Sequence, residues 1–221
     1  MSTSRTPDHF ARLYESNPDP WGFQTDPYEQ AKYRRSIEVL EAALLSRDGP
    51  DNPAPRARLS GHDTGKTTDL SSRRFTAGLE VGCSIGVLTR MLAPLCDTLL
   101  GLDIVDQALE AAVKRCADRP WVRFQRMRMP DEWPDQRFDL ILFSEVLYFL
   151  TPHDIRRCAD RAKHSLLPGA RVLLVNWLGQ SDDPCSGDQA AEHFIAATAG
   201  TLSVRRQDRQ PGYRLDLLTA P

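Results

Sequence analysis

Short apolar segments alternate with segments of helical period from residue 74 to the end of the chain. This alternation predicts a doubly wound α/β fold with a mostly parallel sheet, because strand–helix–strand units of this kind pack helices on both faces. The last two strands follow each other without a helix between them, which indicates a C-terminal antiparallel hairpin. The predicted strands cover 75–81, 98–104, 122–127, the start of 138–150, 171–178, 202–209 and 212–220, and the predicted helices cover 87–95, 106–117, 154–167 and 187–199. The sheet is therefore expected to be seven-stranded.

Two further units precede this domain, which we expect to occupy 74–221. Residues 1–47 start with an aromatic, turn-rich stretch and continue as a helix from Pro27, with Asp26 in the N-cap position. Residues 48–73 are dominated by proline, glycine, serine and charged residues. A segment of this composition cannot bury enough apolar surface to order itself, so we expect a flexible linker.

The overall composition excludes several classes of protein. The formal net charge of −2 gives no reason to expect a nucleic-acid or membrane-surface partner. No apolar run approaches the roughly 20 residues of a transmembrane helix, and the first ten residues lack the apolar core of a signal peptide. The five cysteines are odd in number and have no Cys-x-x-Cys spacing, so we expect no metal site. A cytoplasmic protein is the expectation.

The stretch LEVGCSIGVLT, residues 79–89, forms the turn after the first predicted strand. Doubly wound sheets bind ligands beyond the carboxyl ends of their strands, where this turn lies. Gly82 and Gly86 allow the backbone to approach a ligand closely and to adopt positive φ. Amides at the start of the next helix can face an anionic group. Asp103 ends the second predicted strand, where an acid can accept both hydroxyls of a ribose. Together these residues predict a nucleoside-bearing cofactor.

The glycine spacing favours one class of nucleoside cofactor. A dinucleotide site needs Gly-x-Gly-x-x-Gly, but these positions hold Gly82, Ser84 and Val87. Instead, Glu80 stands two residues before Gly82, and Gly86 follows four residues after it. This acid-x-Gly-x-x-x-Gly pattern resembles motif I of the class I S-adenosylmethionine (SAM) dependent methyltransferases. Ser84 departs from the glycine that the family often has at its position.

Four stretches narrow the resemblance to the NodS-like methyltransferases: DPWGFQTDPYEQAKY, LEVGCSIGVLT, MPDEWPDQRFDLILFSEVLYFL and CSGDQAAEH. The similarity covers about 1–47 and 74–220. It implies a Rossmann-like fold, SAM as the cofactor and an N-terminal helical lid over the SAM-binding domain. It also implies a small-molecule acceptor, such as the amine of a deacetylated amino sugar, and pathway partners such as a deacetylase.

The resemblance also implies which residues contact SAM. Glu80 is expected to anchor the turn near the ammonium of the methionine moiety, Asp103 to bind the ribose and Ile104 to pack on the adenine. The segment after the third strand lacks an acid at the usual position, so the main chain of Met129 is the predicted adenine contact. The full predicted set is Trp21, Tyr28, Lys32, Glu80, Gly82, Cys83 (main chain), Gly86, Asp103, Ile104, Met129 and Ser144.

The lid and the segment after the fourth strand supply the remaining predicted roles. Trp21 and Tyr28 are expected to cover SAM or a sugar face, and Lys32 or Arg35 to pair with the methionine carboxylate. Glu145 and Tyr148 are the predicted catalytic residues. An amine must lose a proton before or during attack on a sulfonium, and the Glu145 carboxylate could take that proton or orient the amine.

Three alternatives stay open at this point. Methylation of a hydroxyl is the nearest one. A nicotinamide-dependent oxidoreductase is disfavoured by the missing glycines. A non-catalytic SAM-binding module is disfavoured by the presence of Gly82, Gly86, Asp103 and Glu145. A nucleic-acid methyltransferase calls for a basic face or an Asn/Asp-Pro-Pro-aromatic motif, and SEVLY, residues 144–148, is neither.

Overall fold

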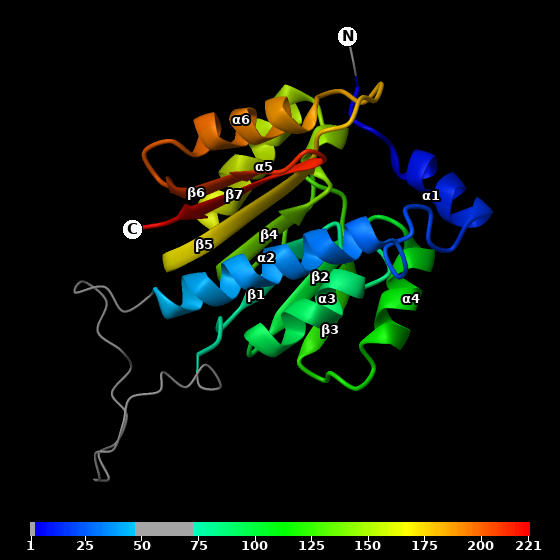
Figure 1. Cartoon of the computed structure of the whole chain (residues 1–221), viewed down its shortest axis with the longest axis horizontal. Helices are drawn as coiled ribbons and strands as arrows, with labels where there is room; N and C mark the ends of the chain where they lie inside the picture. The colour runs from blue at the N-terminus through cyan, green and yellow to red at the C-terminus, as the bar shows by residue number, and fades with distance from the viewer. Residues whose placement is uncertain (1–2, 47–72) are drawn as a thin grey trace.

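The computed structural model describes residues 3–46 and 73–221 (Figure 1). The predicted linker at 48–73 therefore lies, apart from Arg73, outside the described residues. In the described part of the chain, no helix is long and apolar enough to cross a membrane.

A seven-stranded sheet in the order β3-β2-β1-β4-β5-β7-β6 forms the centre of the molecule. The first five strands run parallel, and β7 is antiparallel to both of its neighbours. The strands are β1 (Gly78–Val81), β2 (Leu99–Asp103), β3 (Val122–Arg126), β4 (Phe138–Ser144), β5 (Leu166–Trp177), β6 (Ser203–Arg209) and β7 (Tyr213–Thr219). The predicted doubly wound, mostly parallel sheet with a C-terminal antiparallel hairpin is confirmed.

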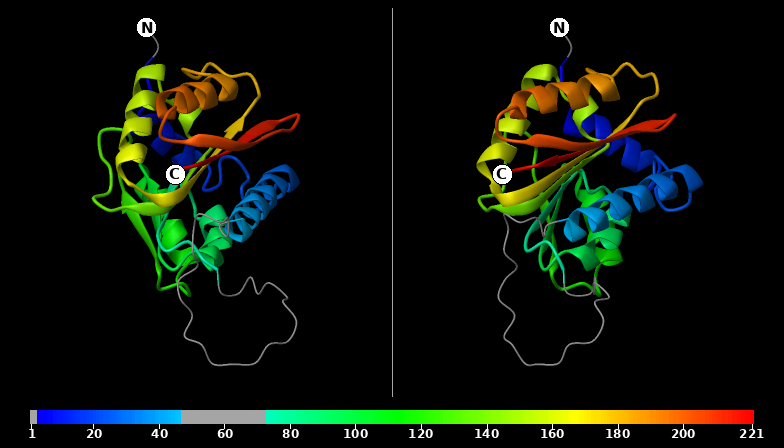
Figure 2. Two further views of the ribbon diagram at one scale, coloured as in Figure 1. Left: turned by 90° about the vertical axis from the view of Figure 1, so that its left-hand side faces the viewer. Right: turned by 60° about the vertical axis from the view of Figure 1, so that its left-hand side comes forward.

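Helices cover both faces of the sheet (Figures 1 and 2). α5 and α6 pack on one face, and α2, α3 and α4 pack on the other. The helices are α1 (Pro7–Ser16), α2 (Pro27–Leu45), α3 (Val87–Leu92), α4 (Asp106–Arg115), α5 (Pro152–His164) and α6 (Gly187–Thr198), with 3₁₀ turns η2 (Ala93–Leu95) and η3 (Leu147–Phe149). Every residue of β1 and β4 is buried, as expected for central strands covered on both faces.

α2 begins as its sequence predicts. The Asp26 side chain accepts the N–H of Tyr28 at 2.7 Å, and Pro27 takes the first helical position. One face of α2 then buries Tyr33, Leu40 and other apolar residues in the core below the sheet. The N-terminal unit is thereby packed against the main domain rather than separated from it.

The predicted end of the helix at 154–167 is wrong. α5 ends at His164, and Leu166 already pairs with Phe138 as the first residue of β5. Pro168 and Gly169, which together are typical of the residues just after a helix, lie inside this long strand. The strand prevails because buried Leu166 packs in the core between the sheet, α5 and α6.

Gly86 offers a direct test of the turn geometry. It has φ of +77°, and a Cβ added there would lie 2.9 Å from both Cα and Cβ of Ala112 in α4. For Gly86→Ala we expect a loss of about 2–4 kcal/mol in the free energy of unfolding, from left-handed strain plus a backbone clash. Gly200 is the matched control, because it has φ of +83° with nothing within 4 Å of an added Cβ.

Urea denaturation of both variants separates the two causes. Gly200→Ala should cost about 1 kcal/mol, from strain alone. Equal losses in the two variants would contradict the close packing of the turn against α4.

Candidate active site

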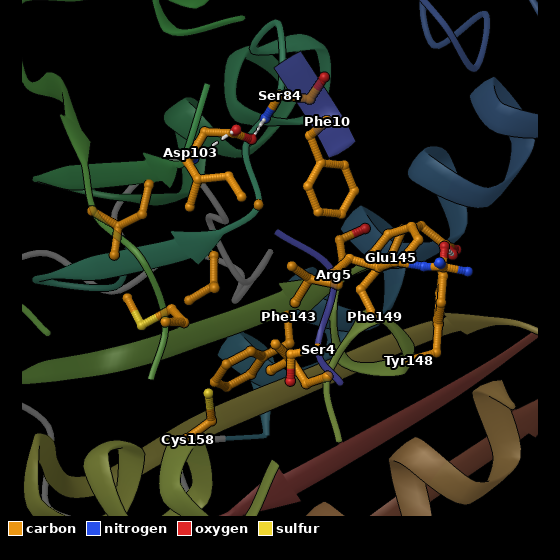
Figure 3. Close-up of a pocket in the computed structure, with 18 of the residues that line it drawn as sticks. Ser4, Arg5, Phe10, Ser84, Asp103, Phe143, Glu145, Tyr148, Phe149 and Cys158 are labelled. Carbon is orange, nitrogen blue, oxygen red and sulfur yellow. Dashed lines mark hydrogen bonds between the residues drawn. The ribbon is translucent and has the colours of Figure 1, made fainter. Parts of the chain in front are cut away.

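A cavity of about 500 Å³ opens at the carboxyl ends of β1, β2 and β4. Its wall combines the glycine turn after β1, the turns after β2, β3 and β4, and side chains from the N-terminal segment, α1 and α2. Figure 3 shows Ser84 and Asp103 on one side of this space and Glu145 and Tyr148 on another, with Phe10 reaching in from α1. Its position is the one at which doubly wound sheets bind ligands.

The glycine turn approaches the cavity through Gly82 and Ser84, which both line it. Gly82 has φ of +80° and Ser84 has φ of +50°. The N–H groups of Gly82 and Cys83 donate to Leu102 O at 2.8 and 2.9 Å, and that of Ser84 donates to Asp103 at 2.8 Å. These three hydrogen bonds hold the turn against β2. The turn faces the cavity at Gly82 and Ser84.

Asp103 stands at the end of β2 and holds the turn after β1 and the turn after β2 together. Its carboxylate accepts the N–H groups of Ser84 (2.8 Å), Ile104 (2.7 Å) and Val105 (3.0 Å). Burial raises the pKa of the Asp103 carboxyl, and these three donors lower it. An ionised carboxylate has about four lone-pair positions, so one acceptor position remains for a ligand on the cavity wall.

Glu80 lies behind the turn rather than in the cavity wall. Its side chain is buried in β1, and burial raises the pKa of Glu80 to about 8. The Thr89 hydroxyl opposes this shift and the charge of Asp103 adds to it. Glu80 is therefore largely protonated near neutral pH in this structure.

The side of the cavity beyond Asp103 is mostly apolar. Ile104, Met129 and Phe143 line it, as do Met127 and Cys158. Two acids also line the cavity near Arg157: Asp131 pairs with it at 2.8 Å and Asp154 at 3.2 Å. Asp131 comes later in the turn after β3 than the usual position of an acidic adenine contact, for which the main chain of Met129 was predicted instead.

The N-terminal segment crosses the cavity and is tied to its far rim. Arg5 donates its backbone N–H to Phe149 O at 2.9 Å, and its guanidinium pairs with Asp183 at 2.8 Å. Ser4 donates to Asp154 at 2.6 Å. Ser4 and Arg5 thereby contact Phe149, Asp154 and Asp183 of the main domain across the cavity. These contacts join segments that are far apart in the sequence, so local sequence patterns did not predict them.

Aromatic side chains of the N-terminal unit close the cavity from above. Phe10 packs edge-on against Phe149, with 4.9 Å between ring centroids, and Tyr14 packs against Trp21 at 5.8 Å. The Tyr14 hydroxyl is hydrogen-bonded to the Ser84 hydroxyl in the glycine turn. The predicted Trp21 lines the cavity, and Tyr14 is an aromatic wall residue that the sequence analysis did not single out.

Lys32 lines the cavity but is already paired. Its side chain is 1% exposed, and its Nζ lies 2.9 Å from Glu29 and 2.7 Å from Glu145. The ammonium also lies 5.2 Å from the ring centroid of Tyr28. Arg35, the alternative cation, pairs with Glu38 and Asp208 instead and is not part of the wall.

Glu145 follows β4 directly and has φ of +57°. One carboxylate oxygen, Oε2, accepts the Tyr148 hydroxyl and the backbone N–H of Trp177, both at 2.9 Å. The other, Oε1, lies 2.7 Å from Lys32 Nζ. Donors from η3, β5 and α2 thus converge on this single side chain.

The cavity brings most of the predicted residues together and leaves three outside. The residues on its wall are Trp21, Tyr28, Lys32, Gly82, Asp103, Ile104, Met129, Ser144, Glu145 and Tyr148. Glu80, Cys83 and Gly86 support the turn from behind. Glu29 is a wall residue that the sequence analysis missed, although its spacing of three from Lys32 on a helix is a signal for an ion pair.

Comparison with known proteins agrees with this geometry. Residues 79–172 match the family model described as a methyltransferase domain. Nodulation protein S of Bradyrhizobium diazoefficiens is 30% identical over 188 residues, which is 84% of this chain and 75% of that protein.

Solved structures share the fold. A crystal structure of N-methyltransferase NodS from Bradyrhizobium japonicum in complex with S-adenosyl-L-homocysteine (SAH) superposes with a TM-score of 0.70 at 20% identity, covering 98% of this chain and 100% of that one. A putative methyltransferase from Pseudomonas syringae is 29% identical with a TM-score of 0.61, covering 85% and 98%.

The raised pKa of Glu80 has a consequence for stability. Its folded value of about 8 exceeds the roughly 4.3 of an unfolded glutamate. The folded state therefore holds a proton that the unfolded state loses, and stability falls as pH rises from about 5 to 8. We expect Glu80→Gln to flatten this dependence by up to about 1.4 kcal/mol per pH unit in chemical denaturation. Glu110→Gln, at an exposed position on α4, is the control and should leave the slope unchanged. Parallel curves for Glu80→Gln and the wild type would contradict the assignment.

Proposed function

The chain belongs to the NodS-like family of class I SAM-dependent methyltransferases, and on that premise we propose that it methylates the amine of a small molecule, such as a deacetylated amino sugar. The family assignment makes SAM the cofactor. The choice of an amine as acceptor is our proposal, and it rests on the charges that line one side of the cavity.

The residues of the cavity fit SAM. Cavities of roughly 300–1,000 Å³ are typical of small-molecule sites, and this one measures about 500 Å³. We propose that the methionine end lies against Gly82 and Ser144, that Asp103 accepts a ribose hydroxyl, and that Ile104 and Met129 pack on the adenine. When bound, SAM supplies an electrophilic methyl group on a sulfonium.

One observation supports an amine acceptor above others. Two carboxylates, those of Glu29 and Glu145, share the single buried ammonium of Lys32 on the cavity wall. With both acids ionised, this cluster has a net charge of −1 in a poorly hydrated place. Such a surplus stabilises a cation nearby, and an alkylammonium is the cationic form of an amine acceptor.

The chain would accelerate the reaction through placement and exclusion of water. Methyl transfer from a sulfonium is an in-line displacement with a neutral leaving group, so no oxyanion needs stabilisation. The aromatic residues Phe10, Tyr14 and Trp21 cover the cavity, and the N-terminal segment crosses it. We propose that residues 1–47 act as the lid of a SAM-binding domain at 74–221, holding acceptor and cofactor together in a dry site.

A free amine also defines the chemistry that must come before this enzyme. Amino sugars commonly carry their nitrogen as an acetamide, whose lone pair is delocalised and a poor nucleophile. A deacetylation therefore has to expose the amine first, and we propose a deacetylase as the enzyme that supplies the acceptor.

The role of Asp103 can be measured by calorimetric titration with SAH. We expect Asp103→Ala to weaken SAH binding by about tenfold or more, because a hydrogen bond to a charged group contributes about 1.5–3 kcal/mol. Asp106→Ala, at an exposed acid at the start of α4, is the control and should bind SAH as the wild type does. Unfolding curves recorded alongside detect any loosening of the turn. Unchanged affinity in a folded Asp103→Ala protein would remove Asp103 from the binding site.

The acceptor class is tested with methyl-labelled SAM and a matched pair of sugars. Glucosamine and N-acetylglucosamine share their hydroxyl groups and differ in whether the nitrogen is a free amine. We expect label to enter glucosamine and short deacetylated chitooligosaccharides, and not their N-acetylated counterparts. Label in N-acetylglucosamine would indicate hydroxyl methylation instead, and label in none of these sugars would contradict the proposed acceptor.

A further inference from the structure

We propose that Glu29 takes the proton from the acceptor amine, and that Glu145 and Tyr148 are positioning residues that shape the wall around it. This assignment rests on the amine acceptor proposed above. It assigns different roles to two carboxylates that share one ammonium. The two differ in how many donor groups already contact their oxygens.

Three donor groups contact the Glu145 carboxylate, whereas one contacts that of Glu29. Oε2 of Glu145 accepts two hydrogen bonds at 2.9 Å, from Tyr148 and from the backbone of Trp177, and its Oε1 lies 2.7 Å from Lys32 Nζ. Protonating this carboxylate would weaken all three contacts at once. The group therefore suits a fixed anchor better than a group that gains and loses a proton in each turnover.

Tyr148 completes this anchor. Its hydroxyl donates to Glu145, and burial together with the nearby Glu145 charge raises the pKa of Tyr148 well above its ordinary value. The phenol consequently keeps its proton and remains a donor at physiological pH. A donor of this kind holds Glu145 in place and cannot act as the base.

Glu29 is placed differently. Its two oxygens face one ammonium, with Lys32 Nζ 2.9 Å from each of them. An ionised carboxylate has about four acceptor positions, so room remains for an N–H donor from the cavity that Glu29 lines. Because Glu29 lies in the first turn of α2, these free acceptor positions are on the part of the cavity wall that residues 1–47 contribute.

The charges around Glu29 suit a proton acceptor. Burial raises the pKa of Glu29, the Lys32 ammonium lowers it, and the charges of Glu145 and Asp26 raise it further. A base is most effective when its pKa lies near the working pH, and this shift moves a carboxyl in that direction. The titratable groups that face Glu29 are Asp26, Tyr28, Lys32 and Tyr33 of α2 with its N-cap, and Glu145 and Tyr148 after β4.

The proton step balances within the site. The acceptor enters as an alkylammonium, and one N–H proton moves to the Glu29 carboxylate, leaving a neutral amine with a free lone pair. That lone pair forms the new N–C bond as the C–S bond breaks, and the sulfur keeps the electron pair of the broken bond. Glu29 then releases its proton to solvent. Lys32 stays paired with Glu145 throughout, so the cluster changes from a charge of −1 to neutral without leaving an isolated buried ion.

Two isosteric variants and one control test this division. Glu29→Gln and Glu145→Gln each remove one carboxylate, and Glu38→Gln alters an exposed glutamate of the same helix α2. For Glu29→Gln we expect kcat with glucosamine to fall about 100-fold or more, the usual contribution of a general base. We also expect the acidic limb of its pH profile of kcat/KM to disappear. Glu145→Gln should keep the acidic limb and mainly raise KM, and Glu38→Gln should match the wild type.

An independent measurement follows the carboxyl itself. In protein labelled with ¹³C at the glutamate side-chain carboxyls, we expect one resonance that titrates above the ordinary glutamate range and is lost in Glu29→Gln. Because Glu80 also has a raised pKa, the spectrum is recorded in the Glu80→Gln background. SAH calorimetry of each variant checks that the cofactor site is intact.

The outcomes separate the two proposals. If the wild type methylates glucosamine and Glu29→Gln retains its kcat within threefold with the acidic limb unchanged, Glu29 is not the base, although the amine acceptor stands. If Glu145→Gln instead loses the limb, Glu145 is the base. If the wild type methylates none of the amines while SAH binds normally, the proposed acceptor fails and the role of Glu29 falls with it.

Discussion

The arrangement of the cavity wall formed by Glu29, Lys32 and Glu145 depends on the buried ammonium of Lys32. It joins α2, which carries Glu29, to the turn after β4, which carries Glu145. Taking a lysine out of water costs several kcal/mol, and only close carboxylates offset this cost. The geometry of the wall satisfies that requirement: α2 lies where Lys32 reaches both acids, and Glu145 presents its carboxylate from a residue with φ of +57°. Removing the lysine would leave the carboxylates of Glu29 and Glu145 without their shared cation.

The side of the cavity formed by the glycine turn and Asp103 could be predicted from the sequence because its information is local. Gly82, Gly86 and Asp103 lie at the ends of consecutive strands, and a parallel sheet brings such ends to one edge. The wall formed by Glu29, Lys32 and Glu145 could not be predicted in the same way. The Glu29–Lys32–Glu145 cluster and the Arg5–Asp183 pair join segments far apart in the sequence, and their contacts depend on how the N-terminal unit packs on the domain. The misplaced end of α5 has the same origin, because the pairing of Leu166 with β4 overrides the local Pro-Gly signal.

Ser84 shows how a departure from a local pattern can be offset by a distant contact. The residue has φ of +50°, which suits glycine better than serine. Its hydroxyl, however, bonds to Tyr14 of α1, and its N–H bonds to Asp103. A glycine at this position would relieve the strain and would remove the side-chain link between the turn and the N-terminal unit. Serine therefore connects the cofactor turn to the residues that cover it.

The two halves of the cavity also differ in how they set charge. Around Asp103, backbone amides stabilise one carboxylate, and these amides are fixed by the sheet and do not titrate. On the wall formed by Glu29, Lys32 and Glu145, two acids share one ammonium, and burial raises the pKa of Glu29. A neutral leaving group needs no charge stabilisation, whereas an amine acceptor must change its protonation state before it reacts. The proposed amine acceptor has to change its protonation state before it reacts, and Glu29 and Glu145 supply two carboxylates on the wall where we propose that it binds.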